Sequence, residues 1–140
     1  MRVFCSLCGD LFHAGHVRFL EIASTYGELY VSVGSDKTIE QLKNRKPIYN
    51  ENERLYIISR IKNVKKAFIG SGEGLMDYIE EFKTIAPDIF VVNHDGDSLE
   101  KLRLCRETGT QYIVLPREPK KGLPIRSTTK IIEDIKNDTI

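Results

Sequence analysis

The sequence has no long hydrophobic run and no excess of charge. Its longest apolar stretches are the length of a strand, too short to span a bilayer. The 21 basic and 20 acidic residues leave a net charge of +1, so no overall field draws the chain toward nucleic acid or an anionic membrane. We therefore expect neither of these as a partner.

The sequence also lacks internal repeats and low-complexity segments, and no change in composition marks a linker. The chain has 140 residues, of which 41% are hydrophobic, and this is enough to bury a core. We expect a single domain over residues 1–140.

Cysteine is scarce, and its three copies cannot all pair. The first residues resemble a strand rather than a cleavable export segment, so we expect a cytoplasmic protein without a disulfide framework. Cys5 and Cys8 have CxxC spacing, which leaves zinc or thiol chemistry as a minor alternative. On a strand their side chains would point to opposite faces. Cys105 is expected on a helix face. These placements favour the interpretation that all three cysteines are small buried residues.

Five compact apolar runs are predicted to be strands, at 3–7, 28–33, 66–69, 88–92 and 111–115. They alternate with segments of helical spacing, as in a parallel sheet covered on both faces. The expected fold class is α/β. It is a Rossmann-like, doubly wound sheet of five parallel strands in the order 3-2-1-4-5, with helices on both faces.

Helices are predicted where apolar residues recur three and four positions apart. Asn50 followed by Glu53 resembles a capping box, and Ser127 is expected to cap the last helix. The predicted apolar faces are Phe19, Ile22, Ala23 and Tyr26; Ile57, Ile58 and Ile61; Leu75, Ile79 and Phe82; and Thr128, Ile131, Ile132 and Ile135.

A histidine pair follows the first predicted strand, in the run 10–16 with the sequence Asp-Leu-Phe-His-Ala-Gly-His. A helix that starts after a strand offers free N–H groups and a positive dipole end, which suit a phosphate. His13 and His16 lie on one face of the first turn, and Gly15 removes a side chain that would obstruct an anion. The expected strand order brings this loop beside the loop of Asp95, in one crevice.

Each of these features also has an ordinary structural interpretation. A single histidine can be a surface or capping residue, Asp95 can be a turn residue, and Arg54 can be a helix-surface residue or a buried ion-pair partner. The glycine-rich loop 70–74 can cradle a phosphate or simply turn. Lys43, Arg45 and Lys46 can bind phosphate or form a solvated cluster. Lys120 and Lys121 can be solvent-exposed or form a flap over a nucleotide.

Three motifs resemble the HxGH nucleotidyltransferase superfamily from residue 3 to residue 135. They are the run 10–16, the segment 35–54 with Lys-Pro-Ile at 46–48, and the run 125–130 with the sequence Ile-Arg-Ser-Thr-Thr-Lys. The chain resembles its cytidylyltransferase-like branch, which includes glycerol-3-phosphate cytidylyltransferase, archaeal FAD synthetase and the nucleotidyl domain of ADP-heptose synthase.

The sequence departs from this pattern in two places. The insert 118–126 separates Arg117 from Ser127, so either Arg117 or Arg126 takes the role of the signature arginine. The tryptophan that follows the fourth strand of glycerol-phosphate enzymes is missing, because this chain has none; a different acceptor pocket is expected. The Lys-Pro-Ile segment is closer to the heptose-type branch, which favours ATP over CTP.

The resemblance implies transfer of AMP or CMP from a nucleoside triphosphate to a phosphorylated small molecule, such as a sugar phosphate, with release of pyrophosphate. Mg²⁺ is the implied cofactor and would bridge phosphate oxygens with few protein ligands. Relatives often dimerise, which suggests a homodimer. The alternative is a non-catalytic nucleotide-binding or regulatory module. The implied catalytic residues are His13, His16, Lys43 and Arg117; the nucleotide-binding residues are Gly15, Asp95, Arg126, Ser127, Thr128 and Thr129; and Asp10 would bind the acceptor.

Overall fold

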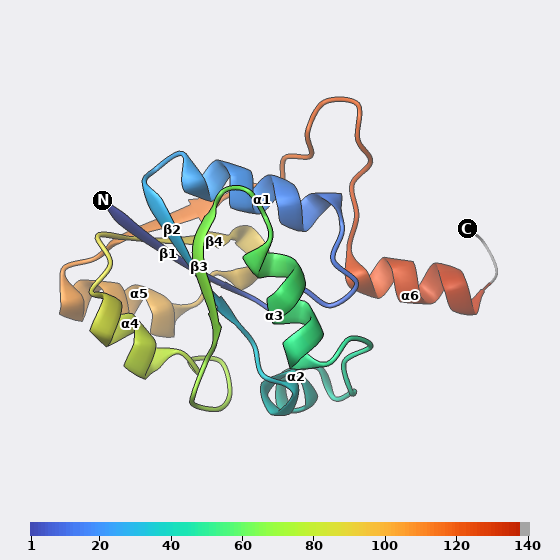
Figure 1. Cartoon of the computed structure of the whole chain (residues 1–140), viewed down its shortest axis with the longest axis horizontal. Coiled ribbons are helices and arrows are strands. Elements are labelled where there is room, and N and C mark those ends of the chain that lie inside the picture. The colour runs from blue at the N-terminus through green and yellow to red at the C-terminus, as the bar shows by residue number, and fades with distance from the viewer. Residues whose placement is uncertain (138–140) are drawn as a thin grey trace.

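A computed structural model describes residues 1–137 as a single parallel sheet surrounded by helices (Figure 1). The strands are β1 Arg2–Leu7, β2 Glu28–Val33, β3 Val64–Ile69, β4 Ile89–Asn93 and β5 Gln111–Leu115. Their order is β3-β2-β1-β4-β5. The expected fold class and strand order are therefore confirmed, and the predicted strand ends differ from the observed ones by at most two residues.

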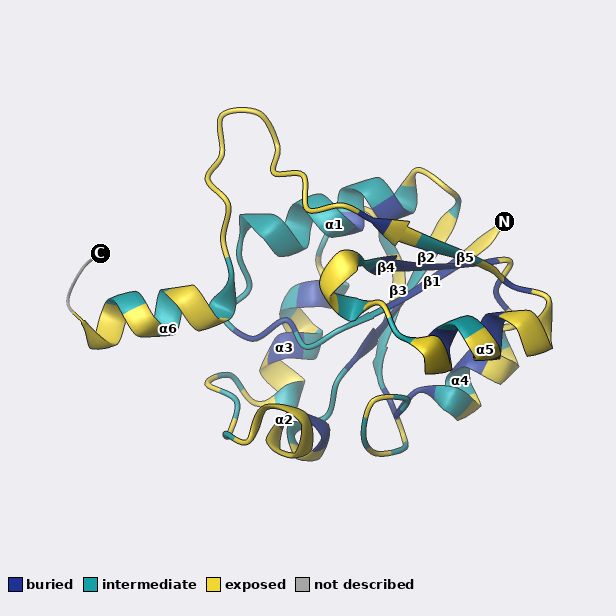
Figure 2. Ribbon diagram, turned by 180° about the vertical axis from the view of Figure 1, so that it is seen from behind, coloured by how far each residue is buried: buried dark blue, intermediate teal, exposed yellow. Residues whose placement is uncertain are grey.

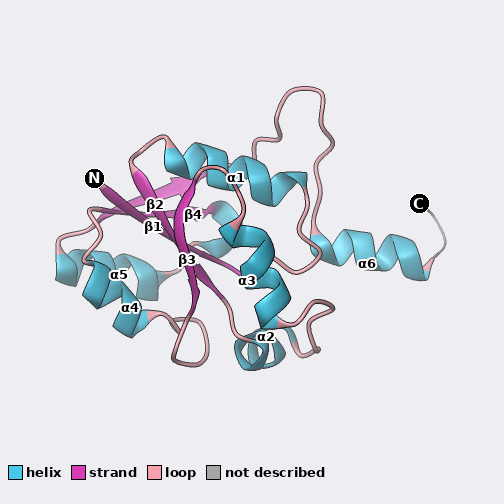
Figure 3. Cartoon of the chain, viewed as in Figure 1, coloured by secondary structure: helices cyan, strands magenta, loops and turns pink. Residues whose placement is uncertain are grey.

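Among residues 1–137, five α-helices and one 3-10 helix lie between the strands, and a sixth α-helix follows the last strand (Figure 3). They are α1 Ala14–Ser24, α2 Asp36–Lys43, α3 Glu51–Ser59, α4 Ile79–Ile85, η1 His94–Gly96, α5 Leu99–Thr108 and α6 Thr128–Lys136. Within residues 1–137 no helix is both long enough and apolar enough to cross a membrane.

The two faces of the sheet carry separate cores, because side chains alternate along each strand. Val3 and Cys5 of β1 pack with residues of α1 and α3 on one face. Phe4 lies on the other face, with α4 and α5. Its ring centroid is 5.1 Å from that of Phe82 and 5.2 Å from that of Phe90. Both cores are built from hydrophobic side chains, so the polar groups at the strand ends are the natural place for chemistry.

Three residues predicted on helix faces lie outside the helices. Tyr26 follows the C-cap of α1, Ile61 follows that of α3, and Leu75 precedes α4. Past the ends of α1 and α3 the apolar spacing continues, but the backbone turns toward the next strand. Leu75 lies in the loop that leads from β3 into α4. Asn50 caps α3 as predicted, with its Oδ1 accepting from the N–H of Glu53 at 2.9 Å.

Helix α6 forms where it was predicted, but its apolar spacing does not bury it. It has no buried residue, and Ile135 is 58% exposed. Figure 2 shows α6 projecting away from the sheet and its covering helices. The helix is attached to the body through its first turn, and that turn reaches the site described next.

Candidate active site

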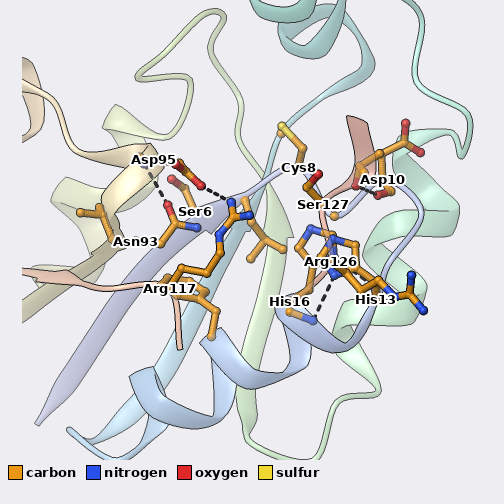
Figure 4. A pocket seen from close by; sticks show the side chains of 18 of the residues that line it. Ser6, Cys8, Asp10, His13, His16, Asn93, Asp95, Arg117, Arg126 and Ser127 are labelled. Atoms are coloured by element: carbon orange, nitrogen blue, oxygen red, sulfur yellow. Dashed lines mark hydrogen bonds and ion pairs between the residues drawn. The ribbon is translucent and has the colours of Figure 1, made fainter. Parts of the chain in front are cut away.

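Two helix N-termini meet at one cavity beyond the carboxyl ends of the strands. The cavity has a volume of about 470 Å³, within the range of small-molecule sites. Figure 4 shows His13, His16, Arg126 and Ser127 near one another, and Arg117, Asp95 and Asn93 farther along the cavity. Every site residue predicted from the sequence lines this cavity.

His13 and His16 cap the start of α1 together. Nδ1 of His13 accepts from the N–H of Gly15 at 3.0 Å, and Nδ1 of His16 accepts from the N–H of His13 at 3.1 Å. The two rings stack with their centroids 3.8 Å apart. Gly15 makes this possible, since a Cβ there would lie 2.9 Å from Cε1 of His13. The glycine thus makes room for the histidine ring, a role the sequence did not indicate.

The capping bonds fix the chemistry of both imidazoles. Because each Nδ1 accepts a backbone N–H, the proton of the neutral ring is on Nε2. Burial lowers the pKa of His16 to about 3, with the charges of His13 and Lys43 acting in the same direction. Burial also lowers the pKa of His13, assisted by Arg117 and Arg126. At neutral pH both rings are uncharged Nε2–H donors, suited to phosphate oxygens that gain charge in a reaction.

The low pKa of His16 predicts a dependence of stability on pH. Between about pH 3 and the ordinary value of 6.5, the unfolded chain binds a proton at this residue and the folded chain does not. The free energy of unfolding contributed by His16 is therefore fully present above pH 6.5 and falls as the pH is lowered. Urea unfolding at pH 7 and pH 5 should show a smaller loss in His16→Asn than in the wild type. Equal losses in the two proteins would contradict the assignment.

The start of α6 is held against the loop that precedes α1. The hydroxyl of Thr128 donates to the backbone carbonyl of Asp10 at 2.6 Å, across 118 residues of sequence. Ser127 caps α6, accepting from the N–H of Lys130 at 3.2 Å. The carbonyl of Arg126 is 3.5 Å from the position that a Cβ on Gly15 would occupy. The first and last motifs are therefore neighbours, as a shared triphosphate requires.

Asp10 has a structural role that the sequence did not reveal. Its carboxylate accepts from the N–H of Ile48 at 2.9 Å, from the N–H of Tyr49 at 2.8 Å and from Arg45 at 3.0 Å. Burial raises the pKa of Asp10, but these three donors outweigh burial and hold it below its usual value. Asp10 thereby joins the loop before α1 to the segment 45–49. Its predicted contact with the acceptor stays a prediction.

The sequence left Arg54 as either a helix-surface residue or a buried ion-pair partner, and the structure shows the second. Its side chain is fully inaccessible to solvent. One guanidinium nitrogen donates to the carbonyls of Cys8 at 2.7 Å and Gly34 at 2.6 Å, and the other donates to Asp36 at 2.8 Å. Nε donates to the carbonyl of Tyr49 at 2.9 Å. Arg54 thus fastens the ends of β1 and β2 to the start of α2, the helix that ends at Lys43.

The predicted cations surround the cavity from different elements. Arg117, after β5, forms an ion pair with Asp95, and His94 contacts the other oxygen of that carboxylate at 3.0 Å. Lys43 is exposed at the end of α2. Arg126 is close enough to lower the pKa of His13. Both candidate signature arginines therefore border the site, one beside Asp95 and the other beside the histidines.

The glycine-rich loop 70–74 packs around an aspartate. A Cβ on Gly70 would lie 2.8 Å from Oδ1 of Asp77, and the N–H of Gly72 donates to the carbonyl of Asp77 at 2.7 Å. These two glycines are needed for close packing, which accounts for the motif without a bound phosphate. Asp77 itself is 4% exposed and borders the cavity.

The three cysteines differ in how far they are buried. Cys5 and Cys105 are buried as predicted, but Cys8 is only half-buried and lines the cavity, because it lies beyond the end of β1. Within the described part of the chain, no three His, Cys, Asp or Glu side chains are grouped to hold a metal ion.

The fold and the paired helix starts define a nucleotidyltransferase of the HxGH type. The family model described as "Cytidylyltransferase-like" matches residues 8–134. The chain belongs to this cytidylyltransferase-like family, and it is a nucleotidyltransferase.

Its curated relatives include archaeal proteins named FAD synthase. The protein of Methanopyrus kandleri is 36% identical over 140 residues, covering 96% of this chain and 91% of its own. That of Methanobrevibacter ruminantium is 32% identical, covering 98% of this chain and 93% of its own. Among solved structures, the lipopolysaccharide core biosynthesis protein of Thermoplasma volcanium has 26% identity and a TM-score of 0.69, covering 86% of this chain and 98% of its own.

Proposed function

We propose that this protein transfers the adenylyl group of ATP to FMN, forming FAD and pyrophosphate. The support from relatives is their common name, FAD synthase, at 32–36% identity over nearly the full chain. The observation that carries the proposal is the bond between Thr128 and the carbonyl of Asp10, because it places the last motif beside the first. FMN also agrees with the phosphorylated acceptor expected from the sequence.

In this reaction a phosphate oxygen of FMN attacks the α-phosphorus of ATP, and the bond from that phosphorus to the β-phosphate oxygen breaks. The protein positions the reactants and stabilises negative charge that develops on the phosphate oxygens. The Nε2–H groups of His13 and His16 would donate to the α-phosphate oxygens. Because both rings are neutral before ATP binds, they add hydrogen-bond donors without repelling the neighbouring cations.

The other predicted residues divide between the phosphates and the nucleoside. Lys43 and one of the two arginines would neutralise phosphate charge. Ser127, Thr128 and Thr129 begin α6, whose free N–H groups suit the β- and γ-phosphates. Gly15 admits the phosphates close to the backbone, and Asp95 would contact the nucleoside.

Mg²⁺ fits this site as an ion carried by the nucleotide. The carboxylates of Asp10 and Asp95 are already engaged by arginines, so the phosphate oxygens themselves would supply most of its ligands. The ion would neutralise charge on the triphosphate and on the departing pyrophosphate.

Chromatography of reactions containing FMN and MgATP tests the proposal. We expect FAD and pyrophosphate in equal amounts, with less product from CTP, and loss of product when EDTA removes the divalent ion. Pyrophosphate release with a sugar phosphate but not with FMN would reject FMN as the acceptor. Binding of ATP without any transfer would instead support the non-catalytic module.

A further inference from the structure

The cavity extends over the ends of β1 and β4 onto the α4–α5 side of the sheet. Ser6 follows Phe4 on that side of β1, and Val92 follows Phe90 on β4. Together with Tyr78 and Lys101 they form the floor of this part of the cavity. The histidines, by contrast, belong to α1 on the opposite side. The cavity thus has two regions, separated by the strand ends.

Because displacement at phosphorus is in line, we expect these two regions of the cavity to hold different reactants. The attacking oxygen and the leaving oxygen lie on opposite sides of the phosphorus. If α6 and the histidine turn hold the triphosphate, the leaving pyrophosphate is on their side. The acceptor then approaches from the α4–α5 side, over the floor of Ser6, Val92, Tyr78 and Lys101.

Lys101 is the unusual member of this floor. It is only 6% exposed, and its ammonium donates to the carbonyl of Gly96 at 2.7 Å. It forms no ion pair with any carboxylate in residues 1–137; the nearby Asp97 accepts instead from the hydroxyl of Tyr112 at 2.8 Å. Burial lowers the pKa of Lys101, while the charge of Asp97 opposes that shift.

The position of Lys101 is unfavourable for stability. It is the third residue of α5, where its N–H donates to the cap Ser98 at 3.2 Å, and a cation is disfavoured at the positive end of a helix. An ammonium has three donors, and burying a cation with few partners costs free energy. A residue that opposes stability in a ligand cavity points to a functional requirement.

We infer that Lys101 determines acceptor specificity by donating a hydrogen bond to a ring carbonyl oxygen of FMN. This inference rests on the proposed adenylylation of FMN. The isoalloxazine ring presents carbonyl oxygens along one edge, and these accept from an ammonium. Asn93, the residue after Val92 on β4, also lines the cavity, with its Oδ1 accepting from the N–H of Gly96 at 2.9 Å.

Lys101→Met tests this role, because methionine keeps the length of the apolar stem and removes the charge. Quenching of FMN fluorescence measures binding apart from activity. We expect the Kd and KM for FMN to rise by about 10- to 100-fold, as for loss of a charged hydrogen bond, with the KM for ATP changed less than about threefold. The Tm should not fall, because a buried cation is removed. Lys65→Met, at an exposed site on β3, is the matched control and should behave as the wild type.

The bound flavin supplies a readout that a purely structural role of Lys101 would not move. A cation beside the ring carbonyl stabilises the anion formed when N3–H ionises. Spectrophotometric titration should give a lower N3 pKa for FMN bound to the wild type than for FMN bound to Lys101→Met. An unchanged Kd for FMN in the variant would overturn the inference. So would a joint loss of FMN binding, ATP binding and Tm, which would indicate a structural role. A wild type that does not bind FMN would reject the proposed function, and the inference with it.

Discussion

His16→Asn is expected to lower kcat by about 10²- to 10³-fold, the usual cost of losing one donor to a transition state. Asparagine places its Oδ1 at the same number of bonds from Cα as Nδ1 of histidine. It can therefore still accept from the N–H of His13 and preserve the start of α1, where that bond is 3.1 Å long. What the variant lacks is the Nε2–H group. The change should appear in kcat rather than in the KM for ATP, because the bond strengthens as charge develops.

His16→Gln is the matched partner of this variant. Its amide nitrogen is at the same number of bonds from Cα as Nε2, so it retains a distal donor but not the capping acceptor. We expect His16→Gln to be less stable than His16→Asn and to keep more of the catalytic rate. If the asparagine variant turned over at the wild-type rate, His16 would be a cap alone.

Arg54→Met is expected to lower the free energy of unfolding by about 3–5 kcal/mol, as for removal of one partner from a buried charge network. The substitution leaves the carbonyls of Cys8 and Gly34 without the donor that now lies within 2.7 Å of each. It also leaves Asp36 without its guanidinium partner. Urea unfolding at pH 7 measures the loss.

Two controls separate the buried network from the loss of charge. Arg54→Lys keeps a positive charge but cannot reach four acceptors with a fork of donors, so an intermediate loss is expected. Arg60→Met removes an exposed arginine at the end of the same helix, where the guanidinium lies 4.6 Å from the ring centroid of Tyr56. That contact contributes about 0.5–1 kcal/mol. Similar losses for Arg54→Met and Arg60→Met would contradict the role assigned to Arg54.

Several elements could be predicted because their signals lie close together in the chain. The apolar runs of the five strands alternate with polar segments, and this alternation favours a doubly wound sheet. Asn50 and Ser127 are local caps whose partners are three residues away. Helix α2 was not predicted, because most of its residues are polar and its start depends on Ser35, which accepts from the N–H of Thr38.

The predicted site residues were recognised by motif, and their spatial relation was not visible in the sequence. His13 and Ser127 lie beside one cavity, where the hydroxyl of Thr128 donates to the carbonyl of Asp10. Lys101 escaped prediction altogether. It is the third residue of a helix, and a lysine is ordinarily exposed. Only the crossing of β4 beside β1 brings it beneath the cavity.

The sequence by itself determined the α/β class and the histidine turn, since each depends on short-range periodicity or on a few adjacent residues, and the strand order was expected from the doubly wound fold class. The tertiary structure alone decided which polar side chains became buried. Asp10 meets Tyr49 across 39 residues, and Arg54 meets Cys8 across 46. The physical reason is that a carboxylate or guanidinium carries the same local signal whether it is solvated or buried. Its partners come from distant loops, and the packing of the sheet selects them.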